Sequence, residues 1–300
     1  MYIARMIHTI ECFAEIAQKY KAIFCDLWGC LHNGKESFQK ALEALYDFRR
    51  AGGYVLLLTN APRPSDSVIK FLNQLGVTSK YYDDIITSGD ATRLGLQSGK
   101  FGCNIFHIGP AHDLCFFDLN IGINMLSKPI NLVPISQASS IVCTGLFDDK
   151  TEEPCDYKSI ISAGIEYGLT LLCANPDIQV DYGHQRLWCA GAIAADYTKA
   201  GGLSIYFGKP HKPIYDAATN KLKNYDPSIK KSEIICVGDG IRTDILGGMS
   251  YGLDTLFVTG GLASEETGTY EGARSPDEKK LRQFFERTKL TPTTSINYFQ

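Results

Sequence analysis

The chain has 300 residues, of which 44% are hydrophobic and 21% are charged, and its formal net charge is -3. This composition is that of an ordinary globular protein, long enough for one domain with an insertion. The slightly negative charge gives no global attraction to nucleic acid. No run approaches the roughly 18 consecutive apolar residues that span a bilayer, so we expect neither a nucleic-acid nor a membrane partner.

The first 20 residues carry charges throughout and lack the uninterrupted apolar core of a signal peptide. Their periodic apolar residues instead predict an amphipathic helix. The ten cysteines show no CxxC pattern and no spacing typical of a zinc site. Several lie inside apolar runs, as Cys25, Cys143 and Cys236 do, which favours buried free thiols in a cytoplasmic protein over a disulfide framework.

Apolar runs typical of buried strands alternate with amphipathic helical patterns along the chain. Strands are predicted at 21–26, 54–59, 84–87, 104–108, 140–147, 170–174, 204–207, 234–237 and 255–258. Helices are predicted from Ser37, as the capping residue, to Phe48, and at 65–75, 157–167, 190–200, 213–223, 241–251 and 277–287. Continuous apolar strands separated by helices predict a parallel sheet that is covered on both faces.

Polar residues follow several of these strands directly, and ligands of open α/β sheets sit beyond the carboxyl ends of the strands. The residues in question are Asp26, Thr59, Asn60, Lys209 and Asp239, with Asp244 five residues after Asp239. Taken singly, each also fits a turn, a helix cap or a solvated loop. Together they suit phosphoryl transfer, because carboxylates hold Mg²⁺, a lysine and a hydroxyl hold phosphoryl oxygens, and an aspartate can attack phosphorus.

Four segments carry a resemblance to a known family. They are DLWGCLHNG (26–34), LLLTN (56–60), GKP (208–210) and GDGIRTD (238–244). This set resembles the four signatures of the haloacid dehalogenase superfamily of phosphatases. The long interval between the second and third segments, together with CANPDIQV (173–180), is similar to the branch with a large inserted α/β cap. The resemblance covers nearly the whole chain.

The resemblance implies a doubly wound parallel, Rossmann-like core sheet with an inserted α/β cap domain. The core would comprise residues 1–89 and 203–300, and the cap residues 90–202. It also implies Mg²⁺ as cofactor and a small-molecule phosphate ester as substrate. The Asn33-Gly34 turn would form the tip of a flap hairpin beside the nucleophile.

The resemblance also assigns roles to single residues. Asp26 would be the nucleophile and a metal ligand. Thr59 would bind phosphate together with the main chain around Asn60, and Lys209 would bridge the nucleophile and the phosphate. The remaining metal ligands would be Asp239, Asp244 and the main-chain carbonyl of Trp28.

The chain departs from the family pattern at Trp28, where these phosphatases usually carry a second aspartate as general acid and base. Tryptophan has no titratable proton, and loss of such a group typically costs roughly 10²–10⁴-fold in rate. Three alternatives follow: a phosphatase that reroutes the acid–base step to another group or uses substrates with acidic leaving groups, a slow phosphotransferase, or a weakened phosphate-ester binding or regulatory module. His32 and His211 are candidate substitutes, although partly exposed loop histidines are the commoner interpretation.

The expected cap carries candidate substrate contacts at Asn175, Asp177 and Arg186, since an arginine can meet a second anionic group. A solvated arginine in a hairpin is the alternative. Dimers through the cap occur in the resembling branch, so a homodimer is also expected from the resemblance.

Overall fold

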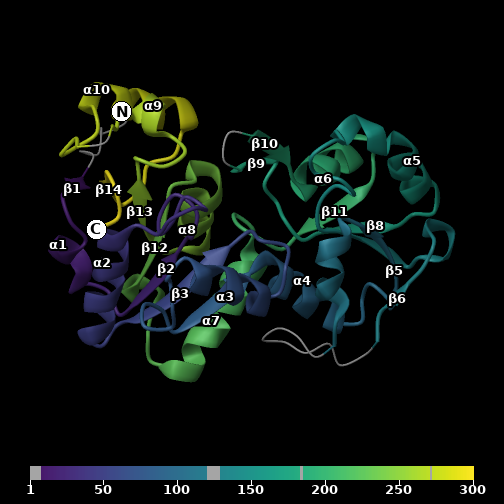
Figure 1. The fold of residues 1–300 in the computed structure, drawn as a ribbon, viewed down its shortest axis with the longest axis horizontal. Coiled ribbons are helices and arrows are strands. Elements are labelled where there is room, and N and C mark those ends of the chain that lie inside the picture. Colours follow the sequence, from purple (N-terminus) through teal and green to yellow (C-terminus); the bar gives the residue numbers. More distant parts are fainter. Residues whose placement is uncertain (1–7, 120–128, 183–184, 271) are drawn as a thin grey trace. The chain divides into compact units, whose positions relative to one another are not determined.

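A computed structural model describes residues 8–119, 129–182, 185–270 and 272–300 (Figure 1). The chain divides into two compact units. The first comprises Met1–Leu58, Leu72–Ile85 and Ala218–Gln300, and the second comprises Thr59–Phe71 and Ile86–Ala217. The second unit contains the expected cap, 90–202, together with the segments that flank it. The exact domain boundaries predicted from the resemblance stay a prediction.

The larger sheet has seven strands in the order β1-β14-β13-β12-β2-β3-β4. Their bounds are β1 (Thr9–Ile10), β14 (Thr294–Ile296), β13 (Asp254–Val258), β12 (Ile234–Gly238), β2 (Ala22–Cys25), β3 (Tyr54–Thr59) and β4 (Asp84–Thr87). The pairs from β1 to β3 are all parallel. The strand order runs outward from β2 on one side and from β12 on the other, so the switch point of the sheet lies between these two strands.

The helices that connect these strands follow from their apolar periodicity. In α2 (Gln39–Arg50), the buried residues are Ala41, Leu42, Leu45 and Phe48, which lie along one face. The other helices are α1 (Ala14–Ala17), α3 (Ser65–Gln74), α4 (Ser88–Gln97), α7 (Lys212–Tyr225), α8 (Leu246–Tyr251), α9 (Ser264–Thr267) and α10 (Glu278–Thr288). A π-helical turn, η5 (Ile241–Ile245), and a 3₁₀ turn, η4 (Lys231–Glu233), complete this set.

A five-stranded sheet organises the second unit, in the order β11-β8-β7-β5-β6 and with every pair parallel. Its strands are β11 (Leu203–Tyr206), β8 (Thr170–Cys173), β7 (Ser140–Cys143), β5 (Asn104–Ile108) and β6 (Asn131–Leu132). Helices α5 (Lys158–Glu166) and α6 (Ala190–Lys199), with turns η1 (Ala111–Phe117), η2 (Ile135–Gln137) and η3 (Pro154–Tyr157), accompany it. A separate antiparallel hairpin joins β9 (Gln179–Tyr182) to β10 (Gln185–Trp188).

The predicted fold class is confirmed, and each predicted strand is present with its ends at or near the expected residues, the largest difference being four residues at the end of 140–147. The predicted N-terminal helix is largely wrong. Residues 1–7 lie outside the described part, Thr9–Ile10 form a strand, and α1 covers only Ala14–Ala17. Ser37 does not cap α2, since Phe38 occupies that position. Helix α4 and strand β14 were not predicted.

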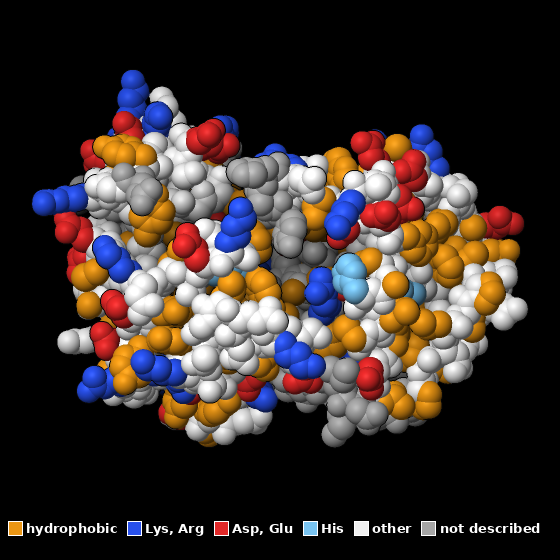
Figure 2. All heavy atoms as spheres, in the orientation of Figure 1, with side chains coloured by type: hydrophobic (Ala, Val, Ile, Leu, Met, Phe, Trp, Pro, Cys, Tyr) orange, Lys and Arg blue, Asp and Glu red, His pale blue; other side chains and the backbone are white. Residues whose placement is uncertain are grey.

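The described residues bear on the expectations for the cysteines, for the surface charge and for membrane-spanning helices. All ten cysteines lie in the described residues and none of them forms a disulfide there, and six of them are buried. On the face drawn in Figure 2, the described Lys and Arg side chains are interspersed with Asp and Glu rather than gathered in one basic patch. Within the described ranges, no helix is long and apolar enough to cross a bilayer.

Candidate active site

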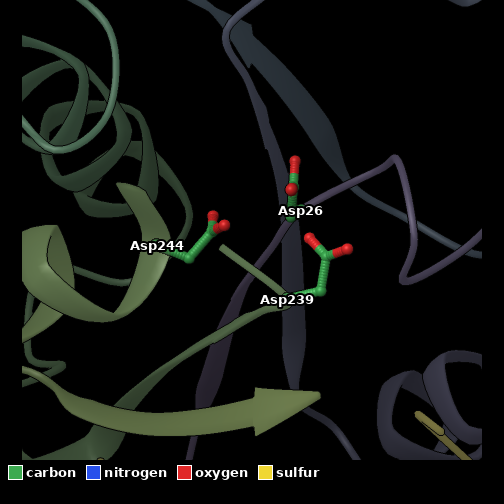
Figure 3. A group of neighbouring side chains, drawn as sticks. All are labelled: Asp26, Asp239 and Asp244. Atoms are coloured by element: carbon green, nitrogen blue, oxygen red, sulfur yellow. The ribbon is translucent and has the colours of Figure 1, made fainter. Parts of the chain in front are cut away.

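Three carboxylates gather beyond the ends of the two strands that flank the switch point (Figure 3). Asp26 follows β2, Asp239 follows β12, and Asp244 lies in the η5 turn. Each offers one oxygen, and these oxygens all lie within 4.8 Å of one another. The main-chain N–H of Asp26 donates to the carbonyl of Val237 over 2.9 Å, which ties the two strand ends together.

Main-chain donors hold the three carboxylates in place. Leu262 N–H donates to Oδ2 of Asp239 over 2.9 Å, and Leu27 N–H donates to Oδ1 of Asp26 over 2.7 Å. Oδ2 of Asp244 accepts from Gly240 N–H. Hydrogen bonds to ionised carboxylates are stronger than neutral ones, so these contacts restrict the rotation of each group.

Glycines pack directly against two of the acids. A Cβ atom at Gly29 or at Gly261 would lie 2.1 Å from Oδ2 of Asp239. A Cβ atom at Gly238 would lie 2.1 Å from Cγ of Asp244. Only the absence of side chains at these positions lets the main chain approach so closely. The sequence analysis did not single out Gly29 or Gly261, although the pair Gly260-Gly261 two residues after a buried strand is a signal for the latter.

The residues present fit a divalent cation. Asp239 and Asp244 are only 3% and 1% exposed, and Asp26 is partly buried. Three carboxylates held this close repel one another unless a cation neutralises them. Mg²⁺ takes oxygen ligands at roughly 2.1 Å, so two ligands on opposite sides of the ion lie about 4.2 Å apart, which is compatible with the 4.8 Å limit observed.

The negative charge of the acid cluster adds to the effect of burial on a neighbouring thiol. Burial first, and the charge of Asp239 second, raise the pKa of the buried Cys30 thiol well above its usual range. A cation would experience the opposite effect and be attracted to this position.

Trp28 and His32 pack against each other beside the nucleophile. Their rings meet edge to face, with centroids 5.4 Å apart. The indole also lies against the turn, since a Cβ atom at Gly34 would be 2.2 Å from Trp28 Cη2. His32 is 2% exposed, so the expectation of a partly exposed loop histidine is wrong for this residue. Burial lowers the pKa of His32 to about 4, which leaves it neutral at pH 7.

The turn at Asn33-Gly34 forms where it was predicted. Gly34 has φ +86°, which favours glycine. The side-chain oxygen of Asn33 accepts from the N–H groups of Lys35 and Glu36, each over 3.0 Å. A single antiparallel bridge joins His32 and Ser37, so the flap is a tight loop without regular strands.

Thr59, Asn60 and Lys209 belong to the second unit, whereas the three carboxylates belong to the first. Thr59 ends β3, and its hydroxyl accepts from Ala61 N–H over 3.2 Å. The side chain of Asn60 and the main chain of Lys209 are joined by two hydrogen bonds, of 2.7 and 3.1 Å. Asn60 is 6% exposed and Lys209 is 2% exposed.

The candidate substrate residues of the cap are placed as follows. Asp177 accepts from Asn60 Nδ2 over 2.9 Å, and its own N–H donates to Asn175 Oδ1 over 3.1 Å. Arg186 is exposed on β10. His211 is half-buried, stacks on Tyr206 with centroids 4.8 Å apart, and has its pKa lowered by burial. Contact of any of these side chains with substrate stays a prediction.

A doubly wound sheet with an acid cluster at its switch point has this cluster where open α/β proteins bind their ligands. A family model described as haloacid dehalogenase-like hydrolase matches residues 23–119, and a second, HAD-hydrolase-like model matches residues 206–278. The crystal structure of a haloacid dehalogenase-like family hydrolase from Brucella suis 1330 is 37% identical, with a TM-score of 0.81. The match covers 97% of this chain and 100% of that one. The chain therefore belongs to the haloacid dehalogenase-like hydrolase family.

Two further relatives carry more specific names. The acid sugar phosphatase of Staphylococcus aureus (strain USA300) is 26% identical over 253 residues, which is 83% of this chain and 90% of that protein. A possible sugar phosphatase from Cytophaga hutchinsonii is 23% identical over 97% of this chain and 98% of its own, with a TM-score of 0.75, and shows likeness of fold. The prediction of a haloacid dehalogenase-like phosphatase is confirmed at the level of the family.

Proposed function

We propose that this chain is a Mg²⁺-dependent phosphatase that hydrolyses a small-molecule phosphate monoester through an aspartyl-phosphate on Asp26. The observation that carries the proposal is the convergence of Asp26, Asp239 and Asp244 within 4.8 Å at the switch point of the sheet. Asp26 is the least buried of the three, as a group that must reach a substrate should be. Family membership and the names of the relatives support the same activity.

Asp26, Asp239, Asp244 and the main-chain carbonyl of Trp28 would hold the Mg²⁺ ion. When bound, the ion supplies the positive charge that lets a carboxylate approach a phosphate ester. The resemblance adds Thr59, the main chain at Asn60 and the ammonium group of Lys209 as the groups that hold the phosphoryl oxygens.

The chemistry proceeds in two displacements. A carboxylate oxygen of Asp26 attacks phosphorus, the bond between phosphorus and the ester oxygen breaks, and the leaving oxygen takes up a proton. Water then attacks the phosphorus of the aspartyl-phosphate, and inorganic phosphate leaves while the Asp26 carboxylate is regenerated.

Trp28 cannot supply the proton that the leaving oxygen needs. His32 is buried, and burial lowers its pKa to about 4, which disfavours the imidazolium ion that a proton-donating histidine must form. We propose that solvent water delivers this proton. The enzyme should therefore favour esters of acidic alcohols and phenols, because their oxygens leave without prior protonation.

The position of Trp28 also favours a second candidate function. A site that retains its carboxylates but lacks the acid–base group would bind phosphate esters and turn them over slowly, as a regulatory module or slow phosphotransferase.

Phosphorylated sugars are the first substrate class to test, because relatives are named as sugar phosphatases. Arg186, Asn175 and Asp177 remain candidate contacts to that substrate.

The test is the release of inorganic phosphate from a panel of sugar phosphates, nucleotides and p-nitrophenyl phosphate, with Mg²⁺ or with EDTA. Metal-dependent release supports the phosphatase, and the preferred ester identifies the substrate class. Binding of phosphate without release of product favours the second candidate. The cytoplasmic location, which is supported by ten cysteines outside any disulfide in the described residues, and the homodimer through the cap stay predictions.

A further inference from the structure

The carboxamide of Asn60 forms two hydrogen bonds with the main chain of a single residue, Lys209. Oδ1 of Asn60 accepts from the N–H of Lys209 over 2.7 Å, and Nδ2 donates to the carbonyl oxygen of the same residue over 3.1 Å. Nδ2 also donates to Oδ1 of Asp177 over 2.9 Å. The amide thus uses one acceptor position and both donor positions in contacts to two residues.

The partners determine the orientation of this amide. A main-chain N–H can only donate, whereas a main-chain carbonyl oxygen and a carboxylate can only accept. Rotating the carboxamide by half a turn would place like groups together at all three contacts. Each buried polar atom in this set therefore depends on the others, and the cost of breaking one contact extends to the rest.

The absence of a side chain at Gly208 makes these two hydrogen bonds possible. A Cβ atom at Gly208 would lie 2.4 Å from Oδ1 of Asn60, 2.7 Å from Cδ of Pro176 and 2.7 Å from Oγ of Ser88. Glycine is the residue that leaves room for the amide to reach the neighbouring peptide. Four chain segments, those of Asn60, Ser88, Pro176 and Gly208, meet at this point.

A bond to both the N–H and the carbonyl of one residue restricts the main chain on either side of its Cα atom. The direction of the Cα–Cβ bond, and with it the starting direction of the lysine side chain, is then fixed. The lysine side chain is long and has high rotamer entropy. A fixed main chain reduces this conformational freedom and narrows the range of positions open to the ammonium group. The 2% exposure of Lys209 fits a side chain held in this way.

From these contacts we infer that Asn60 is a positioning residue that acts through Lys209, and that Asp177 sets the orientation of the Asn60 carboxamide. The inference rests on the proposed function, in which the ammonium group of Lys209 holds phosphoryl oxygens. It assigns the side chain of Asn60 to the lysine, and leaves only the main chain at Asn60 for phosphate. It also gives Asp177 a role in catalysis that needs no contact with substrate.

A kinetic cycle tests the inference. Asn60→Ala, Lys209→Met and the double variant are compared with wild type by kcat/KM for p-nitrophenyl phosphate. Asn60→Ala should lose about 100-fold, the order expected for a misplaced catalytic group. In the Lys209→Met background the same substitution should cost less than about threefold, because nothing remains to position. Asn73→Ala, at an exposed position on α3, is the control for loss of an asparagine. A full 100-fold loss in both backgrounds would mean that Asn60 acts independently of Lys209.

An exchange of the two side chains tests the part played by Asp177. Asn60→Asp alone places two carboxylates in contact and should lose at least as much kcat/KM as Asn60→Ala. Adding Asp177→Asn restores a donor between the two positions and should recover about tenfold. If the loss of kcat/KM in the double variant equals the product of the losses in the two single variants, Asp177 does not set the orientation of residue 60.

A third readout needs no activity and separates this inference from the proposed function. An amine-selective reagent, followed by mass spectrometry, measures how fast each lysine is labelled. Asn60→Ala should raise the labelling of Lys209 at least fivefold relative to that of the exposed Lys212, and leave other lysines unchanged. If wild type hydrolyses no ester, yet Asn60→Ala raises the labelling of Lys209 as expected, the proposed function is wrong and Asn60 still positions Lys209. If wild type is active and neither labelling nor kinetics respond to Asn60→Ala, the inference is wrong.

Discussion

Gly29 lies so close to Asp239 that a Cβ atom there would be 2.1 Å from the carboxylate oxygen Oδ2. Gly29 also has φ +74°, in the left-handed region that side chains other than glycine rarely adopt. A glycine is therefore required at position 29 for two separate reasons, the left-handed main-chain conformation and the close approach of the Asp239 carboxylate. The two reasons can be separated by experiment.

Gly29→Ala should therefore weaken both metal binding and stability. The left-handed conformation costs roughly 1–2 kcal/mol for alanine, and the methyl group must also displace the Asp239 carboxylate. Gly52→Ala is the matched control, because Gly52 has φ +94° and no atom within 4 Å of its expected Cβ. Both variants should lose thermal stability, but only Gly29→Ala should raise the Mg²⁺ concentration needed for half-maximal phosphate release. Equal metal dependence in the two variants would contradict this account of Gly29.

Asp239→Asn and Asp244→Asn should each raise the Mg²⁺ requirement at least tenfold, because removal of one carboxylate removes an anionic ligand from the site. Titration calorimetry with Mg²⁺ alone measures the change without relying on turnover. Asp254→Asn serves as the control, since Asp254 forms an exposed ion pair with Lys19 over 2.5 Å. Such a pair contributes less than about 1 kcal/mol. A Mg²⁺ affinity unchanged in Asp239→Asn would remove that residue from the metal site.

Leaving-group acidity should govern the rate of the wild-type enzyme. Without a general acid at Trp28, kcat/KM should fall by roughly 10²–10⁴ from p-nitrophenyl phosphate to an alkyl phosphate of similar size. Trp28→Asp supplies a proton donor and should make the dependence shallower. The substitution also removes the ring that packs on His32 and Gly34, so a lower melting temperature should accompany the gain. An equally steep dependence in both proteins would show that Trp28 does not limit proton transfer.

Stability should depend on pH through His107. Burial lowers the pKa of His107 from 6.5 to about 4, so the unfolded chain binds its proton at a higher pH than the folded chain does. The free energy of unfolding should therefore fall as the pH drops from 6.5 toward 4, by up to about 3 kcal/mol. His107→Gln removes the titration and can keep the contact that Nε2 makes with Thr144 Oγ1 over 2.9 Å. Urea titrations of both proteins at pH 7 and pH 4.5 measure the difference, and an identical pH dependence would contradict it.

The strands could be predicted because each is a short apolar run, and several of these runs are followed directly by a polar residue. The pattern was strong enough to place Asp26 and Asp239 beyond neighbouring strands, because β2 and β12 are buried along their whole length. Helix α4 was missed because Gly89 and Gly95 argue against a helix. A Cβ atom at Gly89 would lie 2.2 Å from the carbonyl oxygen of Pro62, so that glycine is explained by packing that local sequence does not reveal.

The remaining misses depend on long-range contacts. β14 is only three residues long and owes its place to β13 and β1 on either side, the latter from the opposite end of the chain. The contact between Asn60 and Lys209 joins residues 149 positions apart. The sequence indicated Asn60 as a site residue, but the use of its side chain for the main chain of another site residue requires coordinates.

The covalent role of Asp26 is tested most directly by phosphate release from p-nitrophenyl phosphate and the best sugar phosphate, measured for wild type and Asp26→Asn with Mg²⁺ and with EDTA. The carboxamide keeps the size of the side chain and removes its nucleophilic oxygen. We predict Mg²⁺-dependent release by wild type that EDTA abolishes, and no release by Asp26→Asn above the uncatalysed rate. Mg²⁺-dependent turnover by Asp26→Asn at a rate near that of wild type would contradict the aspartyl-phosphate mechanism.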